Sequence, residues 1–313
     1  MQLLRIPRDL PVERRALSVD ALGEDDGDTV RAVLASLARG AIVEADNLAV
    51  LHALPDASVD LCYADPPFAT GHIQRLSSIR TGSGHQKRRG FGDREYRYEV
   101  VSDMAYEDEL PLGDHLAALR QRLVEVRRVL ATHGSLYLHC DWRTVHHVRL
   151  LLDEVFGPGR FLNELVWAYD YGGRPRDRWP RKHDTILWYA KTNEWRFERD
   201  AIDRVPYLAP GLVGPEKAAR GKLPTDVWWL TIVPPGSAER TGYPTQKPVR
   251  LLERIVAASS RPGDLVLDPY AGSGTTGVAA ARLGRRWLLV DRNPIAVRIA
   301  RNRLAAEGGD AVR

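Results

Sequence analysis

Asp65, Pro66, Pro67 and Phe68 follow directly on the apolar run Val59–Ala64, and their types suit chemistry on an amino group. The exocyclic amine of a base is a poor nucleophile because its lone pair is delocalised into the ring. The Asp65 carboxylate and the Pro66 carbonyl could each accept one amino hydrogen, while Phe68 stacks on the base. The lone pair would then point at an electrophilic methyl carbon. Taken alone, the tetrapeptide also fits a Pro-Pro turn capped by an aspartate.

A second group of residues has the pattern of a nucleoside or nucleotide site. The segment Asp264–Thr276 has the pattern of a strand, a glycine-bearing turn and the beginning of a helix, where a ligand can approach the bare backbone. Asp291 ends the next expected strand, where a carboxylate can accept both ribose hydroxyls. The turn lacks the third glycine of Gly-x-Gly-x-x-Gly, which disfavours an NAD-dependent dehydrogenase.

Strands that alternate with helices must position these two groups. Apolar runs predict strands at residues 41–43, 59–64, 135–140, 184–189, 265–267 and 287–290. Helical spacing predicts helices at residues 47–54, 112–130, 145–156, 249–259, 274–283 and 294–305. This alternation predicts a Rossmann-like, doubly wound α/β sheet with helices on both faces. We expect a turn at His133-Gly134, a long mobile loop at residues 70–103 and irregular structure at residues 192–242.

Composition indicates a globular α/β protein with a basic balance. The 313 residues are 44% hydrophobic and carry a formal net charge of +4, which excludes disordered and fibrous classes and is compatible with a polyanionic partner. Cys62 and Cys140 are the two cysteines and lie in apolar runs, so we expect neither a disulfide framework nor a metal site. With no run long enough to span a bilayer, we expect a cytoplasmic, nucleoid-associated protein.

Together these residues resemble the amino-specific DNA methyltransferases, which modify adenine N6 or cytosine N4, and their order resembles the β group of that family. In that group the catalytic tetrapeptide precedes the cofactor glycine motif, as Asp65–Phe68 precedes Asp268–Thr276 here. Three further segments are similar to family motifs: Val43–Asp60, His183–Lys191 and Gly242–Pro248. The resemblance covers most of residues 40–305.

The resemblance implies a seven-stranded sheet with one antiparallel strand, S-adenosylmethionine as methyl donor and double-stranded DNA as substrate. Asp46 would contact the cofactor adenine, and the segment at residues 242–248 would hold the methionine end. By residue match, the cofactor site would consist of Asp46, Thr245, Gln246, Lys247, Asp268, Tyr270, Ala271, Gly272, Ser273, Gly274, Thr275 and Asp291.

The expected function is that of a site-specific DNA methyltransferase acting on the amino group of a flipped base. Adenine N6 is favoured because the family's adenine enzymes usually carry Asp or Asn where Asp65 stands, whereas its cytosine-N4 enzymes usually carry Ser. Cytosine N4 remains the alternative. More distant alternatives are a protein or RNA amine or amide methyltransferase, disfavoured by the motif order, and an inactive DNA-binding specificity subunit, disfavoured by the intact Asp65, Gly272 and Asp291. A cytosine-C5 enzyme is disfavoured because neither cysteine follows a proline.

Two basic clusters are candidates for DNA contacts. We expect Lys87, Arg88 and Arg89 to close over the DNA backbone near the flipped nucleotide, the alternative being a solvated insert. The second cluster consists of Arg174, Arg176, Arg178 and Lys182. β-group relatives are often dimers, so a homodimer is expected, and a restriction endonuclease partner would be a separate chain.

The motifs divide the chain into five parts. Residues 1–39 form an N-terminal extension, and residues 40–191 the catalytic half of the methyltransferase domain with the basic loop at 70–103. Residues 192–241 form a target-recognition region. Residues 242–306 form the cofactor-binding half, and residues 307–313 a tail.

Overall fold

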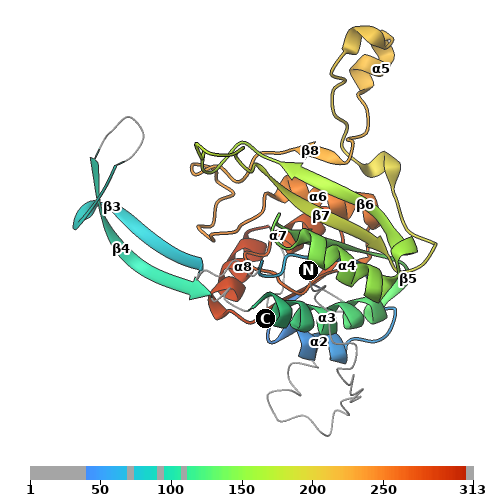
Figure 1. The fold of residues 1–313 in the computed structure, drawn as a ribbon, viewed down its shortest axis with the longest axis horizontal. Helices are drawn as coiled ribbons and strands as arrows, with labels where there is room; N and C mark the ends of the chain where they lie inside the picture. The colour runs from blue at the N-terminus through green and yellow to red at the C-terminus, as the bar shows by residue number, and fades with distance from the viewer. Residues whose placement is uncertain (1–39, 69–73, 90–94, 107–110, 308–313) are drawn as a thin grey trace, which may run out of the picture.

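A computed structural model of the chain describes residues 40–68, 74–89, 95–106 and 111–307, and its centre is an eight-stranded sheet (Figure 1). The strand order is β1-β10-β9-β2-β5-β7-β6-β8. Within this sheet β7 is antiparallel to both of its neighbours, and the other strands run in one common direction. The strands are β1 (Ala41–Glu44), β2 (Val59–Ala64), β5 (Leu130–Cys140), β6 (Phe161–Ala168), β7 (His183–Ala190), β8 (Val227–Trp229), β9 (Leu265–Asp268) and β10 (Arg286–Asp291).

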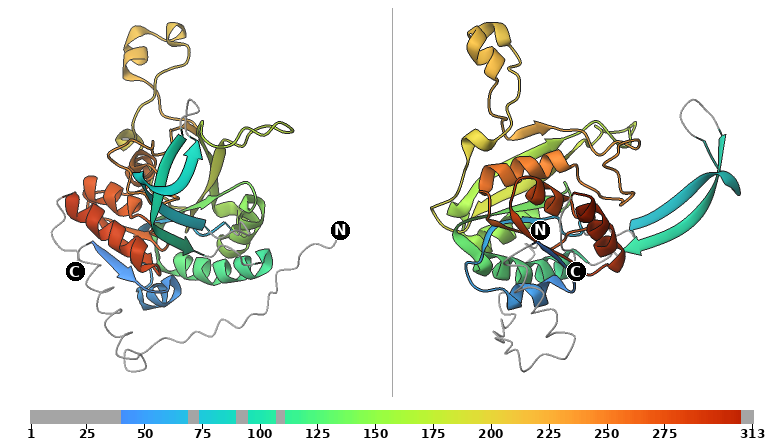
Figure 2. Two further views of the ribbon diagram at one scale, coloured as in Figure 1. Left: turned by 90° about the vertical axis from the view of Figure 1, so that its left-hand side faces the viewer. Right: turned by 180° about the vertical axis from the view of Figure 1, so that it is seen from behind.

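Helices cover both faces of this sheet, which confirms the doubly wound class. One face carries α2 (Asn47–Ala53), α3 (Leu112–Val129) and α4 (Val145–Phe156), and the other carries α6 (Val249–Ser259), α7 (Thr275–Arg282) and α8 (Pro294–Ala306). Figure 2 shows the second layer from behind, with α6 and α8 in front of the sheet. In β9, Leu265 and Leu267 pack toward the α3 side and Val266 toward the α6 side. Strands buried on both faces are apolar throughout, which explains why they were visible as apolar runs.

The apolar runs predicted six strands of this sheet and missed β6 and β8. With both included the sheet has eight strands, one more than the seven that the family resemblance implied. β6 was missed because its apolar run is interrupted by Asn163 and Glu164. β8 is only three residues long, too short to show a period, and pairs in parallel with β6 through Val166 and Val227. The turn expected at His133-Gly134 is wrong, because both residues lie inside β5, where the register with β2 shifts.

The expected loop at residues 70–103 is also wrong for the described residues. β3 (Gln74–Arg89) and β4 (Glu95–Tyr106) pair as a separate antiparallel ribbon, from Gln74 opposite Tyr106 to Arg89 opposite Glu95. The ribbon projects from the body of the protein on the side of α8 (Figures 1 and 2). Cross-strand backbone hydrogen bonds suffice to define such a ribbon, and they leave no hydrophobic period in the sequence.

The region at residues 192–242 is largely irregular, as expected. It contains short elements, η4 (Arg199–Ala201), η5 (Pro210–Leu212), α5 (Pro215–Arg220) and β8, and the segment with α5 extends away from the sheet at the top of Figure 1. In the described ranges no helix is both long and apolar enough to cross a bilayer. Cys62 and Cys140 are buried free thiols.

Candidate active site

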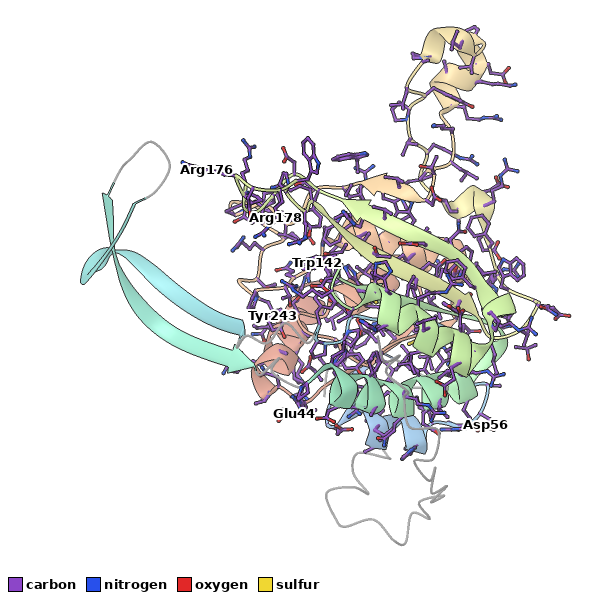
Figure 3. All side chains as sticks on the ribbon, in the orientation of Figure 1. Glu44, Asp56, Trp142, Arg176, Arg178 and Tyr243 are labelled. Atoms are coloured by element: carbon purple, nitrogen blue, oxygen red, sulfur yellow. The ribbon has the colours of Figure 1, made fainter. Side chains whose placement is uncertain are left out.

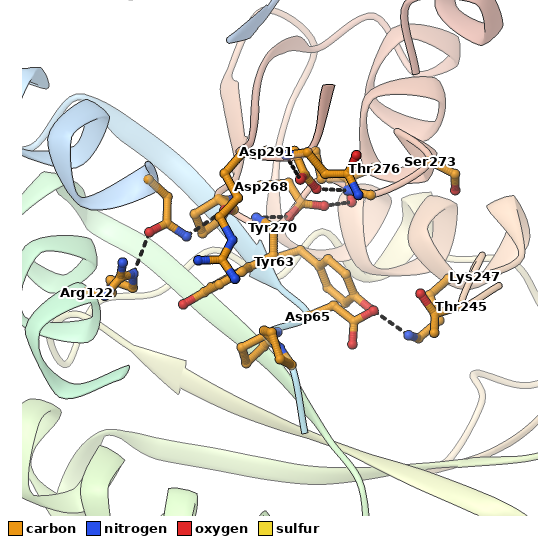
Figure 4. A pocket seen from close by; sticks show the side chains of 18 of the residues that line it. Tyr63, Asp65, Arg122, Thr245, Lys247, Asp268, Tyr270, Ser273, Thr276 and Asp291 are labelled. Atoms are coloured by element: carbon orange, nitrogen blue, oxygen red, sulfur yellow. Dashed lines mark hydrogen bonds and ion pairs between the residues drawn. The ribbon is translucent and has the colours of Figure 1, made fainter. Parts of the chain in front are cut away.

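The carboxyl ends of β2 and β9 open into one pocket, although the two strands are far apart in the sequence. They are parallel neighbours, with Leu61 opposite Val266. The pocket has a volume of about 240 Å³ and is lined by Asp65, just beyond β2, and by Asp268, the last residue of β9 (Figure 4). In a doubly wound sheet this edge is where ligands bind, at the point where the strand order reverses.

The pocket brings together nearly all of the catalytic and cofactor residues that the sequence nominated. The tetrapeptide Asp65–Phe68 lines it, and so do the following nominated cofactor residues: Asp46, Thr245, Lys247, Asp268, Tyr270, Ala271, Gly272, Ser273, Thr275 and Asp291. Asp65 and Gly272 therefore face the same cavity, as the chemistry inferred from the sequence requires.

Gln246 and Gly274 are not in the pocket lining. Gln246 closes a turn: its side-chain oxygen accepts hydrogen bonds from the amide and hydroxyl of Thr241 at 2.8 Å, and its amide nitrogen donates to the Glu239 carbonyl at 2.7 Å. Gly274 has a left-handed φ of +75°, and a Cβ built there would lie 2.7 Å from Cβ of Ala300. These contacts give both residues a supporting role, Gly274 by allowing α7 to pack closely on α8.

The glycine turn is tied to the end of β10. The amide of Gly272 donates to Oδ2 of Asp291 at 2.8 Å, and the amide of Asn293 donates to Oδ1 at 2.8 Å. Burial raises the pKa of Asp291, and these two backbone donors act in the opposite direction. Gly272 has a φ of +49°, and a Cβ there would lie 3.1 Å from the ring of Tyr243, so the turn requires glycine.

Asp268 also supports the glycine turn, through two hydrogen bonds. Its Oδ1 accepts the amide of Tyr270 at 2.9 Å, and its Oδ2 accepts the hydroxyl of Thr276 at 2.5 Å. Burial, with the nearby charges of Asp65 and Asp291, raises its pKa to about 7, against the effect of these two hydrogen bonds. Near neutral pH the group is thus partly protonated, which suits a buried structural carboxyl.

The two oxygens of Asp65, the proposed catalytic carboxylate, have different surroundings. Oδ2 of Asp65 forms an ion pair with the ammonium group of Lys247, drawn as a dashed line in Figure 4. Oδ1 is buried and has no hydrogen-bond partner among the described residues. A buried carboxylate oxygen without a donor is costly in an empty site. It is therefore a candidate acceptor for a ligand hydrogen.

A hydrogen-bonded group behind Phe68 was missed by the sequence analysis. The fully buried ring of His139 stacks on Phe68, with centroids 5.9 Å apart and an interplanar angle of 29°. Its Nδ1 shares a hydrogen bond with the Tyr63 hydroxyl at 2.8 Å, and its Nε2 contacts Oδ2 of Asp184 at 3.2 Å. Burial raises the pKa of Asp184, but the hydrogen bond and charge of His139 outweigh it, so that this pKa is lowered. The signal was a polar residue inside the apolar run at residues 135–140.

Residues of α2 and α3 complete the wall near the expected adenine position. Asp46 accepts the amide of Leu48 at 2.8 Å through Oδ1 and pairs with Arg122 at 2.8 Å through Oδ2. Asn47 donates to the carbonyl of Pro269 at 2.7 Å, which links α2 to the glycine turn. Arg122 and Asn47 also line the pocket, but the helical pattern that predicted their helices concealed this role.

The second basic cluster lies in the connection between β6 and β7, at the carboxyl end of β6. Arg174, Arg176 and Arg178 are exposed. Figure 3 shows Arg176 and Arg178 on the side of the protein from which the ribbon of β3 and β4 projects. Lys182 is half-buried and donates to the Gly172 carbonyl at 2.9 Å.

Arg181 and the first basic cluster also bear on the predicted DNA contacts. The guanidinium of Arg181 stacks on the half-exposed ring of Trp142, 3.5 Å from its centroid. Lys87, Arg88 and Arg89 lie at the end of β3, and their side chains are outside the described part of the structure.

Comparison with known proteins assigns the family. A family model described as DNA methylase, of the N6/N4 type, matches residues 59–302. The chain belongs to this DNA methylase family. Its members use S-adenosylmethionine. The methylase is 30% identical over 268 residues to the type II methyltransferase M.HpaI of Haemophilus parainfluenzae, an alignment that covers 85% of the chain and 74% of the relative.

The methylase is also similar to a second relative and, in fold, to two solved structures. The methylase is 27% identical to the type II methyltransferase M.EcaI of Enterobacter cloacae, over 78% of the chain but only 64% of that relative. Its fold is similar to that of the cytosine-N4-specific PvuII DNA methyltransferase, with a TM-score of 0.60, 17% identity and 87% of each chain covered. It is also similar to M1.HpyAVI in complex with S-adenosylmethionine, with a TM-score of 0.54 and 21% identity over 84% of the methylase and 98% of that chain.

Proposed function

We propose that this DNA methylase transfers the methyl group of S-adenosylmethionine to the exocyclic amino group of a base in DNA, and that the base is adenine, modified at N6. The observation that carries the proposal is Oδ1 of Asp65, a buried acceptor with no partner in the described part of the chain, in a pocket that also contains the glycine turn and Asp291. A hydrogen-bond acceptor in that position suits an amino group better than it suits a carbonyl or an apolar substrate.

The residues of the pocket fit the cofactor. Asp291 is held by two backbone amides, and its remaining lone pairs can accept ribose hydroxyls. Gly272 leaves the turn without a side chain where a ligand must approach closely. When bound, S-adenosylmethionine supplies a methyl group made electrophilic by the positive sulfur.

The tetrapeptide then orients the target amine. Oδ1 of Asp65 accepts one amino hydrogen and the Pro66 carbonyl accepts the other, which directs the nitrogen lone pair out of conjugation with the ring. Phe68, supported from behind by His139, stacks on the flipped base. The nitrogen gains one bond to carbon and must lose one proton, and the Asp65 carboxylate can accept it. Positioning of this kind needs neither a metal nor a covalent intermediate on the protein.

Adenine is proposed over cytosine because of Asp65. The family's cytosine-N4 enzymes usually carry Ser at that position. A serine hydroxyl would accept a hydrogen bond from the amino group only weakly, whereas the Asp65 carboxylate accepts it strongly. The fold similarity to the PvuII enzyme does not bear on this choice, because the identity is only 17%. N4 of cytosine remains the second outcome of the test.

The basic elements around the pocket support DNA as the substrate. β3 contains five Lys or Arg residues and no Asp or Glu, and it leaves the body shortly after the tetrapeptide. The connection with Arg174, Arg176 and Arg178 begins at the same carboxyl edge of the sheet. Basic elements that begin at this edge of the sheet could neutralise backbone phosphates near a flipped nucleotide. The type II names of two relatives support a role beside a restriction endonuclease on a separate chain.

The test measures transfer of labelled methyl groups to DNA and then identifies the modified base. We expect the wild-type enzyme to produce N6-methyladenine, Asp65→Ala to lose transfer while retaining S-adenosylmethionine binding, and the control Glu154→Ala, at an exposed position of α4 outside the pocket lining, to remain active. N4-methylcytosine as the product would assign the other base. Undiminished transfer by Asp65→Ala would refute the role proposed for this residue.

A further inference from the structure

Lys247 contacts the proposed catalytic carboxylate from a segment 182 residues further along the chain. Its ammonium group pairs with Oδ2 of Asp65, and the two side chains are only 9% and 16% exposed. The same ammonium lies 5.7 Å from the ring centroid of Phe68. One lysine thus contacts the carboxylate and lies near the aromatic ring of the tetrapeptide.

The backbone around Lys247 is held on several sides. The hydroxyl of Thr275 donates to the Lys247 carbonyl at 3.1 Å, which links the lysine to the start of α7. The preceding residue, Gln246, closes the turn to Thr241 and Glu239, and α6 begins two residues later. The lysine therefore reaches Asp65 from a fixed turn, unlike a surface lysine on a flexible segment.

We infer that Lys247 is a positioning residue for the proposed methyl transfer: it holds Oδ2 of Asp65, so that Oδ1 faces the amino hydrogen of the base. This inference rests on the proposed function. A free carboxylate can rotate and exchange its two oxygens, whereas an ion pair to one of them removes that freedom and pre-organises the other.

The charge of Lys247 also compensates that of Asp65. Asp65 lies in a pocket with three further carboxyl groups, Asp46, Asp268 and Asp291, and a buried carboxylate is stable only when it is paired or well hydrogen-bonded. Since none of the described residues donates a hydrogen bond to Oδ1, Lys247 provides this compensation from the other oxygen.

The family resemblance points to a different role for this segment, which is to hold the methionine end of the cofactor. The two roles predict different kinetics. A positioning residue acts on the step after binding, so its loss lowers kcat and leaves the Kd for S-adenosylmethionine unchanged. A cofactor ligand acts on binding, so its loss raises that Kd while kcat recovers at saturating cofactor.

The experiment compares Lys247→Met, which keeps the length of the side chain, with Lys247→Arg, which keeps the charge. We expect Lys247→Met to lower kcat about 100-fold, the usual effect of losing one pre-organised electrostatic contact. Its Kd for S-adenosylmethionine, measured by calorimetry, should equal that of the wild type. Lys247→Arg should recover most of the rate because a guanidinium also pairs with a carboxylate. Arg261→Met, which removes an ion pair to Glu198 outside the pocket, is the matched control and should behave as wild type.

Three results would overturn the inference: an unchanged kcat in Lys247→Met, a raised Kd with a normal kcat at saturation, or a Lys247→Arg enzyme as slow as Lys247→Met. If Lys247→Met fails to fold, Lys247→Gln takes its place in the same comparison. A wild-type enzyme that transfers no methyl group to DNA would overturn the proposed function and this inference with it. Normal wild-type transfer with an undiminished Lys247→Met rate would overturn the inference alone.

Discussion

The amide of Gly272 donates a hydrogen bond to Oδ2 of Asp291 at 2.8 Å, and this contact joins the glycine turn after β9 to the end of β10. The turn and the carboxylate are 19 residues apart, on neighbouring parallel strands. Because each holds the other, the Asp291 carboxylate, our proposed acceptor for the ribose, and the bare backbone beside it form one prearranged surface. The affinity for cofactor should therefore depend on Asp291 more than on any exposed carboxylate.

Asp291→Asn should weaken S-adenosylmethionine binding about 10- to 100-fold, the effect of losing charged hydrogen bonds to the ligand. The amide group also places a donor where Gly272 or Asn293 now donates to a carboxylate oxygen. Isothermal titration calorimetry measures the change. Asp200→Asn, at a side chain that is 97% exposed, is the control and should bind as wild type. Equal affinities for the two variants would contradict the role given to Asp291.

Gly274→Ala should destabilise the fold by about 2–4 kcal/mol, because the new methyl group would clash with Ala300 at a backbone conformation that disfavours a side chain. Urea unfolding gives the free energy. Gly113→Ala is the matched control: a Cβ at this helical position of α3 meets no atom within 4 Å, so alanine should be neutral or slightly stabilising there. A Gly274→Ala protein as stable as the control would show that α7 and α8 can separate without loss.

The raised pKa of Asp268 predicts how stability depends on pH. In the folded protein the Asp268 carboxyl stays protonated up to about pH 7, whereas in the unfolded chain it loses its proton near the ordinary aspartate pKa of 3.8. Between these two values the unfolded state binds fewer protons, so the contribution of Asp268 to the free energy of unfolding falls as the pH rises and levels off above about pH 7. The total change is at most about 4 kcal/mol.

Asp268→Asn removes this dependence. Unfolding of the ligand-free proteins in urea at about pH 5 and about pH 8 should show the wild type losing stability relative to the variant as the pH rises. Taking the difference between the two proteins cancels the carboxylates that are not coupled to Asp268. A difference that stays constant, or that moves in favour of the wild type at the higher pH, would show that Asp268 is ionised throughout.

Replacing Lys87, Arg88 and Arg89 together by Ala should weaken DNA binding and flatten its dependence on salt. Each lost phosphate contact lowers the salt slope by about 0.9, so three contacts lower it by up to about 2.7. Fluorescence anisotropy over a series of salt concentrations measures the slope. The control replaces three exposed arginines at the opposite, amino edge of the sheet, Arg127, Arg261 and Arg282. If both triple variants keep the wild-type slope, the end of β3 does not touch DNA.

The local spacing of apolar residues predicted the strands and helices that surround the pocket. α6 has the predicted bounds, Val249–Ser259, and β2, β9 and β10 were visible because strands buried on both faces are continuous apolar runs. The failures also have a physical cause. β8 is too short for a period, and the sequence of β3 and β4, which pair with each other through cross-strand hydrogen bonds, shows little apolar periodicity.

The amino-acid sequence by itself determined the parts that depend on neighbouring residues: the tetrapeptide Asp65–Phe68, the glycine turn and the carboxylate at the end of β10. Such units are local, since the type and order of adjacent residues set both their backbone and their chemistry. Only the tertiary structure decided which parts meet. It put β2 beside β9, paired Lys247 with Asp65 and placed His139 behind Phe68. These contacts join distant segments, and hydrophobic periodicity fixes which face of a strand is buried but not which strand becomes its neighbour.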